Sequence, residues 1–457
     1  MNRLVNIAMV AMFLIAPATA AQPKPNILLI VADDLGYGEL SCQGNQQLAT
    51  PQIDSLAKNG IRFTNAYVSA PVCGPSRAGL ITGRYQQRFG FEFNLTSGGG
   101  GLPPGEQTLA DRLKAAGYVT GMFGKWHLGT GKSHHPTQRG FDWFYGFMPA
   151  CRTYQVRPGE MGKSLLADGT EKPTYLTDTQ AEEAVAFIEQ HREKPWFVYL
   201  PFGAVHAPPA RPGDLLPQAS PPKYRDRFAE VTDPKRRTFL GMELAMDDAI
   251  GAVLAKLRAL QLEENTLIFF ISDNGGPTWQ TTSSNHPLRG SKGDVLEGGV
   301  RIPLIVQWKG HVPADKVDDR PVISLDIVPT ALAAAGIVPA KPENLEGVNL
   351  LSYLTGRQPE LPSRVFCWRY GKKYAARTGD WKLADQGDGA KLYDLKSDIG
   401  EQHDLAAQEP EKVKQLQAAY DAWNARNVEP KWGHEGRRPK PASGAASQDN
   451  IPQRAAK

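Results

Sequence analysis

The feature that most constrains the fold is an alternation of short apolar runs with longer segments of helical periodicity. The apolar runs are residues 27–32 (ILLIVA), 197–200 (FVYL), 267–271 (LIFFI) and 304–306 (LIV). A run without alternating polar positions is typical of a strand that is covered on both faces, as strands of parallel sheets are. We therefore expect an α/β fold built on a large mixed, mostly parallel sheet flanked by helices.

The helical segments and a change of pattern near residue 356 set the expected domain boundaries. Helices are expected at about 50–60, 108–117, 233–260 and 327–335, where apolar residues recur at helical spacing. Four short strands then follow at 365–370, 374–377, 381–383 and 391–393, with a helix at 410–424. We expect a main domain at 21–358, a C-terminal antiparallel sheet with a helix at 359–432, and a disordered basic tail at 433–457.

Residues 1–20 have the pattern of a secretory signal peptide. Arg3 provides a positive start, residues 7–16 are apolar, and residues 18–20 (ATA) form a small-residue cleavage site. An apolar stretch this short cannot cross a bilayer core of about 30 Å. We expect an exported protein, periplasmic or secreted, without a membrane span.

Neither the charge nor the cysteines point to a nucleic-acid partner or a disulfide scaffold. The formal net charge is +4, but six basic and two acidic residues lie from Lys431 onward, so the rest of the chain is near neutral. The cysteines are too few and too scattered for a disulfide framework or a zinc site. The sequence leaves open which of Cys42, Cys151 and Cys367, if any, form a disulfide.

Polar residues follow two of the expected strands at the point where each strand ends. Asp33 and Asp34 come directly after the run at 27–32, and Asp273 and Asn274 follow the run at 267–271. Open parallel sheets build their sites beyond the carboxyl ends of the strands. Carboxylate and amide oxygens suit a hard divalent cation such as calcium, although each pair alone could also cap a turn.

Residues 73–77 (CGPSR), followed by 82–84 (TGR), form the most specific motif of the chain. This motif resembles the signature of the type I sulfatases, members of the alkaline-phosphatase-like superfamily. In that family a maturation enzyme oxidises the cysteine to formylglycine (3-oxoalanine). The resemblance implies that Cys73 is converted and becomes the nucleophile. Because Pro75 is suited to the first turn of a helix, we also expect Cys73 at the positive end of a helix dipole.

The same resemblance assigns the other site residues. Residues 124–129 (GKWHLG), 201–208 (PFGAVHAP) and 288–293 (LRGSKG) closely match sulfatase blocks. The implied ligands of one calcium ion are Asp33, Asp34, Asp273, Asn274 and the converted Cys73, and the implied catalytic residues are Cys73, Arg77, Lys125, His127, His206 and Lys292.

The resemblance also implies a division of roles. One hydroxyl of the formylglycine hydrate attacks sulfur to give a covalent sulfated enzyme, and the second hydroxyl then expels sulfate by carbon–oxygen cleavage. Lys125 and Lys292, with the metal, neutralise the charge on the sulfuryl oxygens. His206, assisted by Lys292, protonates the leaving oxygen, and His127 takes the proton of the second hydroxyl. Arg77 steadies the hydrate and Asp273 helps to deprotonate the attacking hydroxyl.

The function implied is hydrolysis of sulfate esters, with a sulfated carbohydrate as the expected substrate. The closest alternative is a formylglycine-dependent phosphonate or phosphate-diester hydrolase, which shares the chemistry of Cys73. A sulfated-glycan binder without activity is the other alternative, but all the matched positions are present. Aromatic and basic residues on loops are candidate sugar contacts; they include Arg152, His286, Arg289, Trp368 and Arg369. The sequence leaves open the sulfate position, endo or exo action and the oligomeric state.

Overall fold

The computed structural model describes residues 24–95, 100–157, 159–166, 174–209, 219–339 and 344–433. Its centre is a sheet with strand order β11-β2-β10-β9-β1-β8-β4-β5. Only β10 runs antiparallel to its neighbours in this sheet. The mixed, mostly parallel α/β fold expected from the sequence is therefore confirmed. The strands are β1 (Asn26–Ala32), β2 (Ile61–Phe63), β4 (Val119–Lys125), β5 (Trp143–Phe147), β8 (Trp196–Pro201), β9 (Thr266–Ser272), β10 (Leu304–Gln307) and β11 (Lys316–Asp318).

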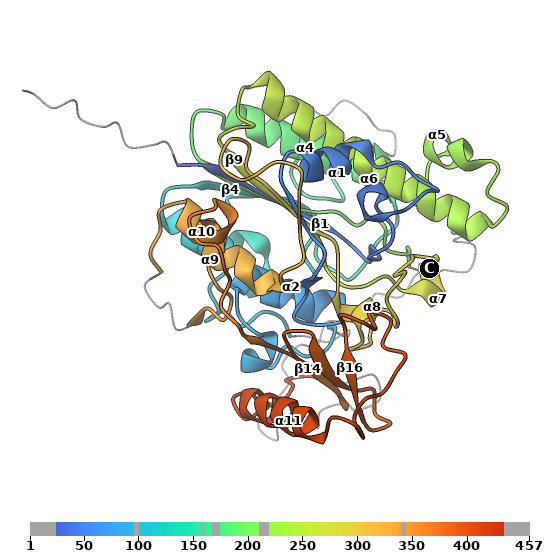
Figure 1. Ribbon diagram of the computed structural model, residues 1–457. Helices are drawn as coiled ribbons and strands as arrows, with labels where there is room; N and C mark the ends of the chain where they lie inside the picture. Colours follow the sequence, from blue (N-terminus) through green and yellow to red (C-terminus); the bar gives the residue numbers. More distant parts are fainter. Residues whose placement is uncertain are drawn as a thin grey trace, which may run out of the picture.

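The central strands are apolar throughout because both faces of the sheet are covered. Along β1, Ile27 and Leu29 pack into one core and Leu28 and Ile30 into the other. Figure 1 shows α1, α4 and α6 on one side of the sheet and α2, α9 and α10 on the other. The helices are α1 (Pro51–Lys58), α4 (Leu176–Gln190), α6 (Pro234–Ala259), α2 (Cys73–Thr82), α3 (Leu109–Ala115), α9 (Ile327–Ala334) and α10 (Leu351–Leu354).

Short elements connect these layers. Two small sheets pair β3 (Ala66–Tyr67) with β12 (Val322–Ile323) and β6 (Gln155–Val156) with β7 (Thr174–Tyr175). Three helices of a single turn are α5 (Pro222–Arg225), α7 (Thr278–Thr281) and α8 (Glu297–Val300). In Figure 1, α7 and α8 lie beside the edge of the main sheet that faces the C-terminal part of the chain.

The C-terminal part forms a separate antiparallel sheet with one helix packed on it. Its strands β13 (Val365–Tyr370), β14 (Lys373–Thr378), β15 (Trp381–Asp385) and β16 (Ala390–Asp394) follow each other in order. Helix α11 (Pro410–Asn424) closes a small core through Leu416 and Tyr420. We call β13–β16 and α11 the C-terminal subdomain. The expected strands and helix are all present, whereas the boundary at 358 stays a prediction.

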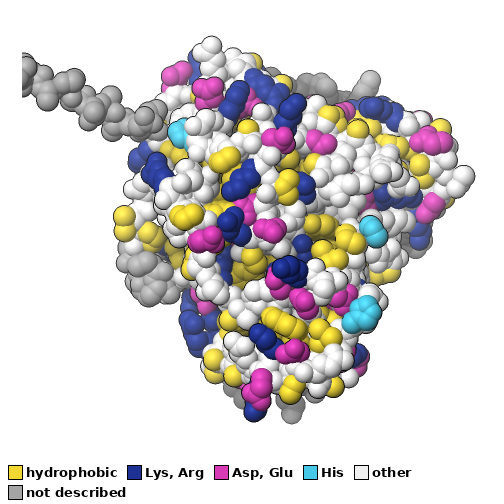
Figure 2. Space-filling view, in the orientation of Figure 1, with side chains coloured by type: hydrophobic (Ala, Val, Ile, Leu, Met, Phe, Trp, Pro, Cys, Tyr) yellow, Lys and Arg dark blue, Asp and Glu magenta, His cyan; other side chains and the backbone are white. Residues whose placement is uncertain are grey.

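Helices expected at 50–60, 108–117, 233–260 and 327–335 are confirmed as α1, α3, α6 and α9 within two residues at each end. Helix α4 was not expected. The expected signal peptide at 1–20 and nearly all of the expected tail at 433–457 lie outside the described residues. Within the described ranges, none of the helices combines the length and apolar character needed to cross a membrane. Figure 2 shows basic and acidic side chains interspersed on one face of the molecule.

Candidate active site

The carboxyl ends of β1 and β9 bring the two pairs of polar residues together. In the parallel register Ala32 lies opposite Ser272, so the residues that follow each strand, Asp33 and Asp273, are neighbours at the same edge of the sheet. The backbone N–H of Asp34 donates to Asp273 Oδ1 over 3.1 Å, and Asn274 Nδ2 donates to Asp34 Oδ1 over 2.7 Å. Asp34 has a positive φ of 65°, a turn conformation that directs its side chain into the site.

Cys73 opens helix α2 and lies against this carboxylate group. Its Sγ is 3.6 Å from Asp33 Oδ1 and 3.8 Å from Asp34 Oδ1. All residues of α2 are buried, so the packing of the helix fixes where the sulfur lies. Burial raises the pKa of the Cys73 thiol well above its usual value. The unmodified thiol is therefore held protonated, which makes it a poor nucleophile as it stands.

Three cations reach the same carboxylates from three different elements. Arg77, one turn along α2 from Cys73, donates from Nε to Asp273 Oδ2 over 2.8 Å. Lys125, at the end of β4, places Nζ 2.6 Å from Asp33 Oδ2, and Lys292 places Nζ 2.8 Å from Asp34 Oδ2. The three carboxylates and three cations balance in charge. Each ion is therefore paired, as buried charges must be.

Burial and the neighbouring cations together set the pKa of each of these carboxyl groups. Burial acts to raise the pKa of Asp33, but Lys125, His206 and Arg77 outweigh it and lower that pKa below its usual value. Burial likewise opposes the charge of Lys292, yet Asp34 keeps the pKa of this lysine well above normal. Asp273 differs because burial outweighs Arg77 and raises the pKa of Asp273 to about 6.

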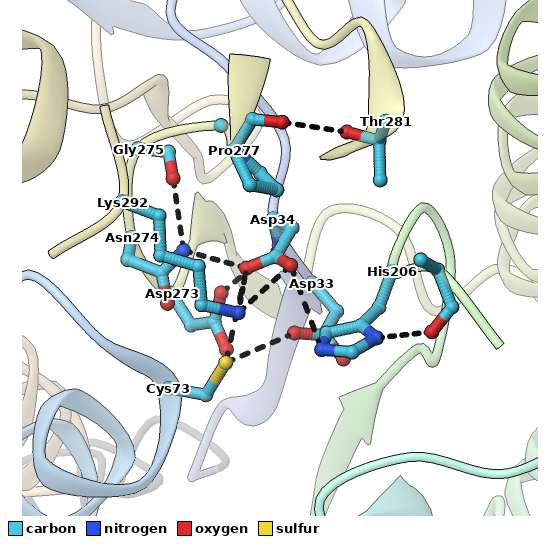
Figure 3. A network of polar contacts seen from close by, with 12 residues as sticks. Asp33, Asp34, Cys73, His206, Asp273, Asn274, Gly275, Pro277, Thr281 and Lys292 are labelled. Atoms are coloured by element: carbon cyan, nitrogen blue, oxygen red, sulfur yellow. Dashed lines mark hydrogen bonds and ion pairs between the residues drawn. The ribbon is translucent and has the colours of Figure 1, made fainter. Parts of the chain in front are cut away.

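Two histidines flank the group. His206, in the loop after β8, has Nε2 3.6 Å from Asp34 Oδ2, and its Nδ1 lies 2.5 Å from the carbonyl of Ala207. Figure 3 shows Asp34 between Lys292 and Asn274 on one side and His206 on the other, with Cys73 below. Both ring nitrogens of His127 are buried without a hydrogen-bond partner among the described residues. Burial, with Lys125 and Arg77 nearby, lowers the pKa of His127 well below normal, so its ring is neutral.

The donor set fits a hard divalent cation. Ligand atoms of Asp33, Asp34, Cys73 and Asp273 all lie within 4.8 Å of one another, and all four residues are buried. In addition, Asn274 Oδ1 is buried without a hydrogen-bond partner in the described part of the chain. Carboxylate and amide oxygens at this density are the ligands that calcium takes in proteins. The structure therefore brings together the residues that the sequence predicted as calcium ligands.

A small cavity lies beside His206 and Asp33. It is lined by Asp33, His206, Cys151 and Arg152, together with Tyr154 and other loop residues. Arg152 donates to Glu160 Oε2 over 2.6 Å. Cys151 was not singled out from the sequence, because a lone cysteine in a loop carries no motif. Only the structure shows that Cys151 lies beside the candidate site, because it lines the same cavity as Arg152 and His206.

The other candidate sugar contacts are placed differently. His286 and Arg289 are exposed, and Arg289 donates to the backbone carbonyl of Glu401 over 2.7 Å. Arg369 forms an ion pair with Glu92 at 2.5 Å. Trp368 has no exposed surface, and its indole N–H donates to the Val68 carbonyl over 2.7 Å. The prediction of Trp368 as a sugar contact is therefore wrong, because its ring is part of the core.

All four cysteines are free thiols, so none of the disulfides left open by the sequence is formed. Cys42 and Cys151 are partly buried, whereas Cys73 and Cys367 are fully buried. Burial and the neighbouring Asp54 raise the pKa of Cys42 to about 12. Cys73 is therefore distinguished from the other thiols by its surroundings, the carboxylates and cations described above.

Comparison with known proteins gives two matching family models. The model described as "Sulfatase" matches residues 25–337, and "N-sulphoglucosamine sulphohydrolase, C-terminal" matches residues 291–422. Human N-acetylgalactosamine-6-sulfatase is 34% identical over 394 residues, covering 80% of this chain and 72% of that protein. Mouse steryl-sulfatase is 33% identical over 452 residues, covering 79% of this chain and 69% of that protein.

Solved structures are also similar to this chain in sequence and fold. The crystal structure of Ps i-CgsB in complex with k-i-k-neocarrahexaose has a TM-score of 0.81 at 32% identity, covering 90% of this chain and 95% of that chain. The PsFucS1 sulfatase from Pseudoalteromonas sp. has a TM-score of 0.73 at 26% identity, covering 88% of this chain and 91% of that chain.

Proposed function

Because this chain belongs to the sulfatase family, it is a sulfuric ester hydrolase, and we propose that it releases sulfate from a sulfated carbohydrate by means of a formylglycine made from Cys73. The observation that carries this proposal is the position of Cys73. Its sulfur faces Asp33 and Asp34 at 3.6 and 3.8 Å, at the point where Arg77, Lys125 and Lys292 converge. An anionic ester brought to this point meets the densest group of cations in the site.

The converted side chain and the metal supply what the unmodified residues lack. Formylglycine provides, as its hydrate, a hydroxyl nucleophile with a second hydroxyl on the same carbon. A calcium ion held by Asp33, Asp34, Asp273 and Asn274 supplies Lewis-acid polarisation. The unpaired Asn274 Oδ1 and the three carboxylates support this ligand set.

The cations of the chain bind and orient the sulfate group. Lys125 and Lys292 each carry a charge that is already paired with a carboxylate in the resting site, so their ammonium groups are held in fixed positions. A preorganised charge of this kind stabilises negative charge developing on the sulfuryl oxygens without further rearrangement. Arg77 is held by Asp273 and so keeps the first turn of α2, which carries Cys73, in register with the carboxylates.

The two histidines move protons at different atoms. The Nδ1–H of His206 donates to the Ala207 carbonyl, so Nε2 is the atom that can give a proton to the leaving oxygen, and it does so when the ring is cationic. Burial lowers the pKa of His206 below its usual value, although Asp33 and Asp34, whose Oδ2 lies 3.6 Å from that Nε2, oppose this shift and favour the cationic ring. His127 is neutral with both ring nitrogens unpaired among the described residues, which suits the acceptance of a proton from the second hydroxyl of the formylglycine hydrate.

A carbohydrate substrate is supported by the relatives and by the cavity. The complex of Ps i-CgsB contains an oligosaccharide, and the human relative is named for N-acetylgalactosamine 6-sulfate. The sequence identity to mouse steryl-sulfatase is nearly the same as that to the human relative, so sequence identity alone does not distinguish a carbohydrate from a steroid substrate. Arg152, which lines the small cavity beside His206, is the basic residue that we propose for contact with a neighbouring anionic group of a glycan, in place of its present partner Glu160.

We further propose that the protein is exported, because residues 1–20 carry the three parts of a signal peptide. Mass spectrometry of the N-terminus and of the Cys73 peptide, from protein recovered outside the cytoplasm, tests the cleavage and the conversion of Cys73. Protein that retains Met1 in that fraction would contradict the proposed cleavage.

The experiment that tests the function is measurement of free sulfate from a panel of esters. The chain is coexpressed with a formylglycine-generating enzyme, and conversion of Cys73 is verified by mass. The panel contains an aryl sulfate, carrageenan and fucan oligosaccharides, glycosaminoglycan oligosaccharides, a steroid sulfate and a phosphodiester. We expect sulfate release from one glycan class. Turnover of the phosphodiester alone would favour the alternative diesterase, and turnover of the steroid sulfate alone would contradict the carbohydrate proposal.

A further inference from the structure

We propose that the C-terminal subdomain positions Lys292 for catalysis and that Lys373, on β14, is the positioning residue that does so. The inference rests on the role proposed for Lys292 and adds to it the reason why a separate sheet is packed beside the site. Lys373 lies on a different sheet from the residues of the site and far from Lys292 in the sequence. Its effect is therefore exerted through the segment of backbone that carries Lys292.

Lys292 is the second residue of a tight turn formed by residues 291–294. The backbone N–H of Asp294 donates to the Ser291 carbonyl over 2.9 Å, and Gly293 has a positive φ of 91°. This pattern is that of a type II turn, in which the third residue requires a positive φ. The side chain of Asp294 closes the same turn, because Asp294 Oδ2 accepts the N–H of Ser291 over 3.0 Å. The orientation of Lys292 therefore depends on how this turn is held.

Lys373 holds the turn from the side of the C-terminal subdomain. Its Nζ donates to the backbone carbonyl of Gly293 over 2.9 Å and to Asp294 Oδ1 over 2.7 Å. Both acceptors directly follow Lys292, and Asp294 also supports Ser291. One ammonium group thus fixes two points of the turn. From the opposite side, Gly293 donates its N–H to the carbonyl of Pro71, two residues before Cys73.

A second contact between the same two parts of the chain lies a few residues further on. Lys382, on β15, is fully buried and pairs with Glu297 at 2.8 Å and with Glu401 at 3.0 Å. Glu401 Oε2 also accepts the backbone N–H of Glu297 over 2.7 Å. This buried group joins α8, which follows the Lys292 turn, to the C-terminal subdomain. The two contacts together hold residues 293–297 against β14 and β15.

The two contacts differ in how they can be tested. Removal of Lys382 would leave Glu401 buried without its cation and Glu297 with Arg301 alone. Loss of a buried charge partner strongly destabilises a protein and would prevent any conclusion about catalysis. The side chains of Lys373 and Asp294 are 31% and 29% exposed. Breaking this partly solvated pair costs little global stability. Lys373 is therefore the residue at which positioning and folding can be separated.

The test compares Lys373→Ala with Lys373→Arg and with a control on the same sheet. Lys391 on β16 also forms an ion pair, with Asp388, but contacts neither the turn nor the site through it. We expect Lys373→Ala to lower kcat/KM for an aryl sulfate about tenfold, because a displacement of about 1 Å at a catalytic group has effects of this size or larger. Lys373→Arg, which keeps both donors, should restore most activity, and Lys391→Ala should equal the parent. All Tm values should agree within about 2 °C.

A binding measurement shows whether the effect passes through Lys292. The affinity of inorganic sulfate for the converted, calcium-loaded enzyme is measured by calorimetry for the parent, Lys373→Ala, Lys292→Ala and the double variant. We expect each single variant to weaken sulfate binding and the double variant to bind no more weakly than Lys292→Ala, since the two residues act as one unit.

The outcomes separate this inference from the proposed function. A parent enzyme that releases no sulfate from any ester contradicts the proposed function itself. An active parent with an equally active Lys373→Ala variant overturns the inference alone. Additive losses of sulfate affinity in the double variant, or an equal loss in Lys391→Ala, also overturn it, because the subdomain would then contribute stability rather than the position of Lys292.

Discussion

Asn274 and Asp34 are joined by a hydrogen bond that leaves one oxygen unused. Asn274 Nδ2 donates to Asp34 Oδ1 over 2.7 Å, while Asn274 Oδ1 is buried and has no hydrogen-bond partner in the part of the chain that the structure describes. A buried acceptor without a partner costs about 1–3 kcal/mol. The carboxylates of Asp33, Asp34 and Asp273 form a cluster in the same site, so a bound cation would give the unpaired oxygen a partner among further oxygen ligands.

The first prediction concerns this cation. Asp34→Asn should weaken calcium binding at least about tenfold, because the ion loses a charged ligand. Calorimetric titration of the unconverted chain measures this without reference to activity. Asp248→Asn, at an exposed position on α6, is the control and should bind calcium like the parent. Equal calcium affinity in the parent and in Asp34→Asn would show that calcium binds at another site.

The second prediction concerns the cavity beside His206. Arg152→Gln should raise KM for a sulfated oligosaccharide about tenfold while leaving an aryl sulfate nearly unaffected, because only the larger substrate reaches the guanidinium. Glu160→Gln should have the opposite effect, since Glu160 occupies Arg152 in the resting site. Initial rates measured over a range of concentrations of each substrate give the two KM values to be compared. Equal changes of KM on both substrates would exclude Arg152 as a glycan contact.

The third prediction separates a core residue from a binding residue. Trp368 is fully buried and its indole N–H bonds the Val68 carbonyl, so Trp368→Phe should lower the free energy of unfolding by about 2–3 kcal/mol. KM of the folded fraction should stay unchanged. Urea unfolding and initial rates on one preparation measure both quantities. A raised KM at parental stability would restore Trp368 as a substrate contact.

The fourth prediction is a pH dependence of stability. Asp247 on α6 accepts the backbone N–H groups of Gln52 and Ile53, yet burial outweighs these bonds and raises its pKa from 3.8 to about 7. The folded state therefore binds this proton more tightly than the unfolded state. Stability conferred by the protonated carboxyl is present below about pH 4 and declines as the pH rises to about 7, by up to about 4 kcal/mol.

Asp247→Asn should remove that decline, because the amide does not ionise. The free energy of unfolding in urea, measured between pH 4 and 8 with calcium present, gives the comparison. The neighbouring exposed residue provides the matched variant, Asp248→Asn, which should keep most of the slope of the parent, because burial raises the pKa of Asp247 more than the charge of Asp248 does. A slope in Asp247→Asn as steep as that of the parent would assign the pH dependence to other buried carboxyls.

Much of the site could be predicted because short motifs lie at strand and helix ends. Asp33 and Asp273 follow apolar runs, and the parallel register of β1 and β9 makes them neighbours. Cys73 opens α2, as the motif and Pro75 predicted. In each case the local sequence carries both the element boundary and the functional residue.

What could not be predicted depends on contacts between distant segments. Lys373 reaches the Lys292 turn, and Cys151 lines the cavity beside His206, only because separate elements pack together. Trp368 reads as a surface aromatic within a short strand, and only its packing against Tyr67 reveals a core position. Helix α4 begins after a β-strand of two residues, so no strong boundary signal precedes it.

The role of Cys73 is tested by the rate of sulfate release as a function of the converted fraction of this residue. Preparations with increasing conversion, quantified by mass spectrometry of the peptide, are assayed on one sulfate ester, with Cys73→Ala as the zero point. The account predicts a rate proportional to the converted fraction and no turnover by Cys73→Ala at a nearly unchanged Tm. Sulfate release by unconverted enzyme or by Cys73→Ala would contradict it.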